Sequence, residues 1–114
     1  MPTPHIAWRS RYEPGVPQGL PPADRSFPQL LVEAAAAAPG QTALVYYRRR
    51  TSYAQLEARV ALAAQAFLRL GLRPGERVAV ALPNGPLACE LLLGAMRAGG
   101  VVLAIAPDQP APTV

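Results

Sequence analysis

The chain has 114 residues, which is enough for a single domain with one modest core, and its 51% hydrophobic content excludes a disordered chain. Its formal charge of +4 rests on 11 basic residues, all of them arginine, and the lack of lysine excludes any mechanism of this chain that needs an ammonium group. Cys89 is the single cysteine, and we expect a cytoplasmic protein with neither an internal disulfide nor a transmembrane segment.

Residues 1–25 are rich in proline and show little periodicity, which predicts an extended arm. The arm also carries Ile6, Trp8, Tyr12 and Val16, and a free linker rarely holds apolar residues at this density. We therefore expect residues 1–25 to dock on a protein surface.

The segment after the arm predicts a helix followed by a strand. Ser26 has the features of an N-cap, with Pro28 in the first turn and Gln29 at capping-box spacing, and Pro39-Gly40 ends the helix. Residues 42–47 are rich in strand formers and predict a short strand.

The next segment predicts the best-defined helix of the chain, beginning at Ser52. Ser52 and Gln55 repeat the capping-box spacing, and Gly71 follows the last apolar residue, where a left-handed backbone is favoured. Apolar residues recur at alternating steps of three and four and form one stripe, which predicts a core-facing side. The stripe consists of Tyr53, Leu56, Val60, Ala63, Phe67 and Leu70.

The last part of the chain predicts a strand over residues 77–82, a largely apolar helix over 86–98 and a second strand over 101–106. A strand, a crossover helix and a second strand form a βαβ unit, so we expect the two strands to be parallel and the fold class to be α/β. Parallel sheets are covered by helices on both faces, and this chain has few elements to cover them. The predicted strands and helices therefore resemble one end of a larger sheet. Residues 107–114 form a proline-rich tail after the last strand.

The amino-acid sequence that opens with Tyr53 and Leu56 and continues through the Gly71 turn resembles the N-terminal region of adenylate-forming enzymes, the AMP-dependent synthetase and ligase superfamily. The similarity runs from Tyr53 to Val102 and includes the segments PGERV (74–78), LPN (82–84) and AGGV (98–101). The arm segment WRSRYEPGVPQGL, residues 8–20, resembles the segment before the first helix of long-chain fatty-acid CoA ligases. Ala106-Pro107 stands where members usually have Asn-Pro, so nothing after Ala106 is carried over.

The resemblance implies that residues 26–106 are part of an AMP-binding ligase domain, and that the full-length protein uses ATP and Mg²⁺ to form an acyl-adenylate and then an acyl-CoA. The sequence contains no phosphate loop ending in lysine and no recognisable ribose-binding acid. We therefore expect no catalytic, cofactor-binding or metal-binding residue in this chain and no ligase activity from the chain alone. The implied partner is the remainder of the ligase domain or a second copy of the chain.

Three segments have a possible functional interpretation beside a structural one. Arg48–Arg50 could form a nucleic-acid patch, but such a patch needs further basic residues on the same face and interleaved aromatic residues. Neither is evident, so a polar turn is favoured and we expect no nucleic-acid binding. Asn84-Gly85-Pro86 could hold a phosphate at a helix N-terminus, but a single glycine without GxGxxG or Walker spacing is a weak signal, so a plain cap and turn is favoured. Cys89 could pair with His5, the single histidine, although a buried small apolar role is favoured.

An alternative to the ligase interpretation is a non-enzymatic α/β interaction module or remnant. Such a module would dock on another ligase chain or associate with itself through open sheet edges. The DNA directly downstream distinguishes the two interpretations, because a ligase requires the phosphate loop and the lysine-bearing segments to follow.

Overall fold

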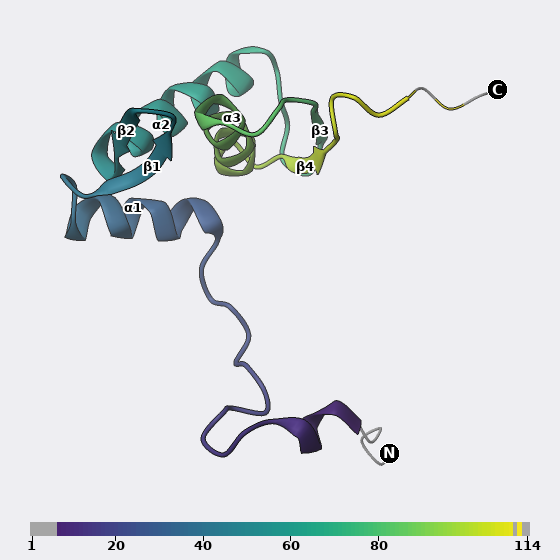
Figure 1. Cartoon of the computed structure of the whole chain (residues 1–114). Helices are drawn as coiled ribbons and strands as arrows, with labels where there is room; N and C mark the ends of the chain where they lie inside the picture. Colours follow the sequence, from purple (N-terminus) through teal and green to yellow (C-terminus); the bar gives the residue numbers. More distant parts are fainter. Residues whose placement is uncertain (1–6, 111, 113–114) are drawn as a thin grey trace.

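The structure is a computed structural model that describes residues 7–110 and 112. Figure 1 shows α1, α2 and α3 beside one another, with the strands β1 and β2 at one end of this body and the strands β3 and β4 at the other. The elements in chain order are the 3-10 helix η1 (Ala7–Arg11), α1 (Phe27–Ala37), β1 (Thr42–Tyr46), β2 (Arg49–Ser52), α2 (Tyr53–Arg69), β3 (Arg77–Val80), α3 (Pro86–Arg97) and β4 (Val101–Ala104). The fold is mixed α/β, as the sequence predicts.

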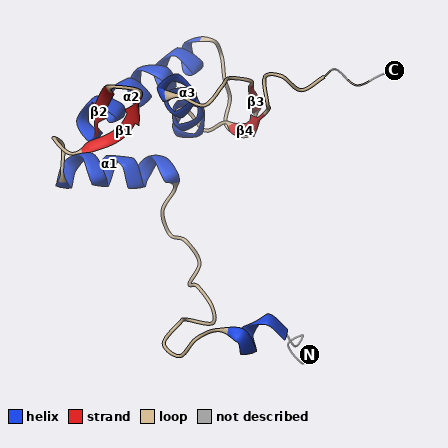
Figure 2. Ribbon diagram, viewed as in Figure 1, coloured by secondary structure: helices blue, strands red, loops and turns tan. Residues whose placement is uncertain are grey.

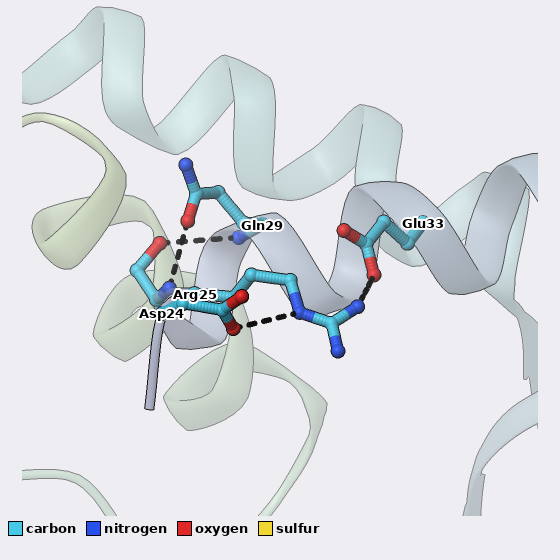
Figure 3. Close-up of polar contacts among 5 residues, drawn as sticks. Asp24, Arg25, Gln29 and Glu33 are labelled. Carbon is cyan, nitrogen blue, oxygen red and sulfur yellow. Dashed lines mark hydrogen bonds and ion pairs between the residues drawn. The ribbon is translucent and has the colours of Figure 1, made fainter. Parts of the chain in front are cut away.

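Helix α1 begins at the residue that the capping pattern predicts. The Ser26 hydroxyl accepts a hydrogen bond from the Gln29 N–H at 3.3 Å, and the Gln29 Oε1 accepts one from the Ser26 N–H at 2.8 Å. Figure 3 shows Arg25 beside this cap, between Asp24 and Glu33. The Arg25 guanidinium lies 2.6 Å from the Glu33 carboxylate, so the last residues of the arm are tied to the first turns of the helix.

Strands β1 and β2 form an antiparallel hairpin that the sequence analysis did not predict in full. The prediction of a polar turn over Arg48–Arg50 is wrong in part, because Arg49 and Arg50 lie in β2 and pair with Tyr46 and Val45. Strand pairing uses backbone groups, so charged side chains are tolerated where they face solvent. The one buried residue of β2 is Thr51, which is 6% exposed and follows the arginines directly.

Helix α2 carries the second capping box, with Ser52 and Gln55 exchanging hydrogen bonds of 3.0 and 3.1 Å. Gly71 follows the helix with a φ of 92°, as its position after the apolar stripe predicts. The stripe itself is only partly buried. Leu56 and Val60 are in the core and Phe67 is half-buried, but Leu70 is 84% exposed because it lies beyond the last helical residue.

Strands β3 and β4 are parallel and connected by α3, which confirms the predicted βαβ unit (Figure 2). Arg77 pairs with Val101 and Val80 with Ala104. The hairpin strands do not join this pair, so the structure contains two separate two-stranded sheets among its described residues. Strands β3 and β4 are each shorter than the predicted 77–82 and 101–106, because their pairing ends at Val80 and Ala104.

The core lies where the hairpin meets the helices. It is formed by Leu31 of α1 with Leu56 and Val60 of α2, and Val60 is completely buried. Half-buried apolar residues pack around these three: Ala43, Leu44, Tyr53 and Leu93. Helix α3 contacts α1, α2, β3 and β4, which confirms the expectation that so apolar a helix is covered on more than one side.

Beyond the contact of Arg25 with Glu33, the described part of the arm runs away from α1 (Figure 1). The Trp8 and Tyr12 rings contact each other at a tilt, with centroids 5.4 Å apart, yet Trp8 is 53% and Leu20 is 89% exposed. The radius of gyration is 18.4 Å, well above the roughly 13 Å of a compact domain near this size. The docking of residues 1–25 therefore stays a prediction, and Ile6 lies outside the described residues.

Candidate functional site

The carboxyl ends of β3 and β4 border a hollow of about 340 Å³. In parallel α/β sheets this edge is the usual location of ligands. The hollow is lined by Val80, Leu82, Pro83, Asn84, Ala88, Leu92, Ala104, Ile105, Ala106 and Pro107. Asn84 is the only residue of this lining with a polar side chain, and none of the lining residues is titratable. This surface can therefore accept apolar contacts, but it provides no acid, base or nucleophile.

The segment Asn84-Gly85-Pro86 is a turn that begins α3, as predicted. Gly85 is the N-cap of α3, and no side chain accepts a capping hydrogen bond from the first backbone N–H groups of the helix. A Cβ at position 85 would lie 3.6 Å from the Tyr46 ring, so the start of α3 faces the hairpin at ordinary contact distance. The segment therefore joins α3 to the hairpin, and its geometry adds nothing to the phosphate-binding interpretation.

Cys89 is half-buried in α3 and is not the fully buried residue that its sequence context predicts. It borders a hollow of about 290 Å³ between α3 and β1, together with Leu44 and Tyr46. His5 lies outside the described residues, so the pairing of Cys89 with His5 stays untested. Nothing that lines this hollow is an acid or a base that would activate the thiol.

Four charged residues of the two longer helices form ion pairs between them. Glu57 and Arg97 lie 2.5 Å apart, and Arg59 and Glu90 lie 3.4 Å apart, so two bridges connect α2 to α3. Within residues 7–110 and 112, no group of three His, Cys, Asp or Glu side chains is placed to hold a metal ion. In the same part of the chain, no helix is both long enough and apolar enough to cross a membrane.

A third hollow, of about 480 Å³, lies between the hairpin and α3 and has a more basic lining. Three of its lining residues are arginines, namely Arg49, Arg50 and Arg59, and they stand beside Tyr46 and Leu87. The sequence analysis treated Arg48–Arg50 apart from the tyrosines before them. The signal that the sequence analysis missed is that Tyr46 and Tyr47 directly precede the arginines.

Comparison with known proteins relates this chain to one family. A family model described as AMP-binding enzyme matches residues 31–114. A long-chain-fatty-acid–CoA ligase of Bacillus subtilis is 34% identical over 101 residues, which is 88% of this chain and 18% of the ligase. The pyochelin synthetase PchE of Pseudomonas aeruginosa is 36% identical over 76 residues, which is 67% of this chain and 5% of the synthetase. The chain therefore spans less than a fifth of the length of either relative.

Solved structures show the same fold. A fatty acyl CoA synthetase of Mycobacterium tuberculosis is 31% identical, with a TM-score of 0.68, and the match covers 72% of this chain and 17% of that one. The N-terminal subdomain of NpsA from Klebsiella oxytoca has a TM-score of 0.71 at 23% identity, and the match covers 74% of this chain and 22% of that one. The arrangement of α1, the hairpin, α2 and the βαβ unit is thus one that N-terminal subdomains of adenylate-forming enzymes share.

Proposed function

Because the chain belongs to the AMP-binding enzyme family and corresponds to the N-terminal region of adenylate-forming enzymes, we propose that it supplies part of the large domain of an acid–thiol ligase acting on fatty acids. In this role the chain is a structural part of the large domain. The helices and the βαβ unit form one end of the large domain, and the residues that carry the chemistry lie elsewhere.

The observation that favours a fatty-acid ligase over a peptide-synthetase adenylation domain is the number of residues that each relative matches in this chain. The match to the Bacillus subtilis ligase covers 101 residues. Residues 26–114 alone are too short to hold it, so it includes part of the arm. The match to PchE covers 76 residues and needs none of the arm. The match whose length requires part of the arm is thus the one with the fatty-acid ligase, and this supports the proposal.

The family implies ATP-dependent chemistry, but the residues of this chain do not fit ATP and Mg²⁺. The sequence has no lysine and no segment rich in serine, threonine and glycine that ends in one. Its described part has no cluster of three metal-binding side chains. We propose that this chain has no catalytic, cofactor-binding or metal-binding residue, and that the partner which completes it is the remainder of the ligase domain.

The interaction-module alternative has no observation in its favour. The relatives named above are adenylate-forming enzymes, and the open edges of the β3–β4 pair are equally expected for one end of a larger sheet. Self-association through these edges would require the parallel pair to be extended by a second copy.

A chimera tests the proposal. Residues 8–106 replace the matching segment of the Bacillus subtilis ligase, and acyl-CoA formation from fatty acids is measured. A second chimera places the same residues in the adenylation region of PchE, and ATP–pyrophosphate exchange is measured with the acid that PchE itself activates. We expect the ligase chimera to keep activity and the PchE chimera to lose it.

The control is the ligase chimera with Val60→Asp, which places a carboxylate at a completely buried position and should abolish activity. Retention of activity by the PchE chimera alone would contradict the fatty-acid assignment. Separately, the purified chain should show no ATP–pyrophosphate exchange with fatty acids. Exchange above a no-enzyme control would contradict the absence of catalytic residues.

A further inference from the structure

The tip of the β1–β2 hairpin presents an aromatic pair to solvent. Tyr47 is the first residue of the two-residue connection and has a φ of 53°, where glycine is usual. Its ring meets the Tyr46 ring edge-on, with centroids 4.6 Å apart, and the residue is 85% exposed. The chain thus holds a bulky ring outward in a backbone conformation that disfavours bulky residues.

The same tip is strongly basic. Arg48, Arg49 and Arg50 are exposed, and none of them forms an ion pair with any residue in 7–110 or 112. Arg59 lies at the same hollow, and its partner Glu90 is the only carboxylate in the lining. Three arginines, Arg49, Arg50 and Arg59, therefore share this lining with a single carboxylate, and that carboxylate is already paired with Arg59. Apart from Glu90, no carboxylate in the lining offsets this positive charge.

Aliphatic side chains surround these charges. Val45 is 64% exposed and Leu87, in the first turn of α3, is 56% exposed. Tyrosine and arginine beside exposed aliphatic residues are the composition of surfaces that lie at the boundary between lipid headgroups and acyl chains. An anionic lipid surface supplies the negative charge that the arginines lack, and each basic residue near such a surface adds to binding.

We propose that the hairpin and the start of α3 dock on an anionic membrane surface. We call this surface the hairpin patch, and it consists of Val45, Tyr46, Tyr47, Arg48, Arg49, Arg50, Arg59 and Leu87. The arginines contact lipid phosphates, and Tyr47, as the most protruding ring, lies at the headgroup level. The proposal goes beyond the ligase role and is independent of it, because docking is measured without any activity.

Nucleic acid is the other polyanion that such a patch could meet, and the geometry favours it less. Single-stranded nucleic acid binds where aromatic faces are open for bases to stack. In the tip only Tyr47 has a largely open ring, because the Tyr46 ring meets Tyr47 edge-on and lies near Gly85, so successive bases would find no second ring to stack on. The exposed Val45 and Leu87 offer no hydrogen bond to a phosphate or a base, whereas both gain from contact with lipid.

The test is co-sedimentation of the 114-residue chain with two kinds of vesicle, phosphatidylcholine alone and phosphatidylcholine with phosphatidylglycerol. The hairpin variant carries Arg48→Gln, Arg49→Gln and Arg50→Gln. Its matched control carries Arg69→Gln, Arg73→Gln and Arg77→Gln, which remove the same charge at exposed positions outside the patch. Circular dichroism verifies that both variants fold, and Tyr47→Ser, with all arginines kept, is a second probe of the tip.

We expect the unmodified chain to prefer the anionic vesicles and the hairpin variant to bind them roughly tenfold to a hundredfold more weakly. The control variant should stay within about threefold of the unmodified chain, because its charges lie away from the lipid. Equal loss in both arginine variants would reduce the effect to net charge and overturn the proposal. Equal binding to both vesicle types, or tighter binding to a single-stranded oligonucleotide than to anionic vesicles, would also overturn it.

Discussion

Gly94 of α3 lies directly against Ala63 of α2, so that a Cβ at position 94 would stand 2.5 Å from the Ala63 Cβ. The backbone N of Ala64 would lie 3.1 Å from the same position. Glycine is thus what allows the two helices to cross this closely, and this crossing is the most extensive contact between elements of the structure.

Gly94→Ala should therefore destabilise the chain although it improves helix propensity. Overpacking costs about 1–3 kcal/mol and the propensity gain is at most roughly 1 kcal/mol, so we expect the free energy of unfolding in urea to fall, by up to about 2 kcal/mol. The matched test is the double variant Ala63→Gly with Gly94→Ala, which moves the methyl group across the interface. A coupling energy near zero in this double-mutant cycle would show that the two positions do not touch.

Ser52→Ala should remove the cap of α2. The Ser52 hydroxyl accepts the Gln55 N–H at 3.1 Å, and without it this N–H loses its partner in the structure. We expect a loss of about 1 kcal/mol in the free energy of unfolding, measured by urea denaturation. Ser10→Ala in the exposed arm is the control and should change this energy by less than about 0.5 kcal/mol. Equal effects of the two substitutions would contradict the capping role.

Burial along α2 predicts a gradient of mutational cost. Val60 is completely buried, so Val60→Ala should cost roughly 2–3 kcal/mol. Leu70 is 84% exposed, and Leu70→Ala should cost less than about 0.5 kcal/mol.

Phe67 lies between these extremes. Its side chain is half-buried, so Phe67→Ala should cost less than the roughly 3–5 kcal/mol of a fully buried phenylalanine. Urea unfolding of the three variants gives the order directly. A larger loss for Leu70→Ala than for Val60→Ala would mean that α2 presents a different face to the core.

Tyr47→Gly should stabilise the hairpin. A left-handed conformation costs a non-glycine residue on the order of 1–3 kcal/mol, and glycine adopts it without strain. After the greater entropy loss of glycine on folding, we expect a net gain of about 0.5–1 kcal/mol in thermal or urea unfolding. Arg48→Gly is the control, because Arg48 has no positive φ and the substitution there should destabilise. A loss of stability in Tyr47→Gly would show that contacts of the ring outweigh the strain.

The candidate surfaces were only partly predictable from sequence. Arg48–Arg50 were visible as a basic run, and a polar turn was the natural interpretation of three adjacent charges. The structure places Arg49 and Arg50 in a strand and brings Arg59 of α2 and Leu87 of α3 to the same hollow. These residues come from three separate elements, and no local pattern in the sequence relates them.

The sequence by itself determined the elements whose causes are local. The capping boxes at Ser26 and Ser52, the glycine after α2 and the order of the βαβ unit all depend on residues a few positions apart, and the structure confirms each of them. Only the tertiary structure decided the pairing of β2 with β1, the close crossing at Gly94 and the exposure of Leu70. The physical reason is that pairing, crossing and burial depend on surfaces that meet only when distant segments of the chain pack together.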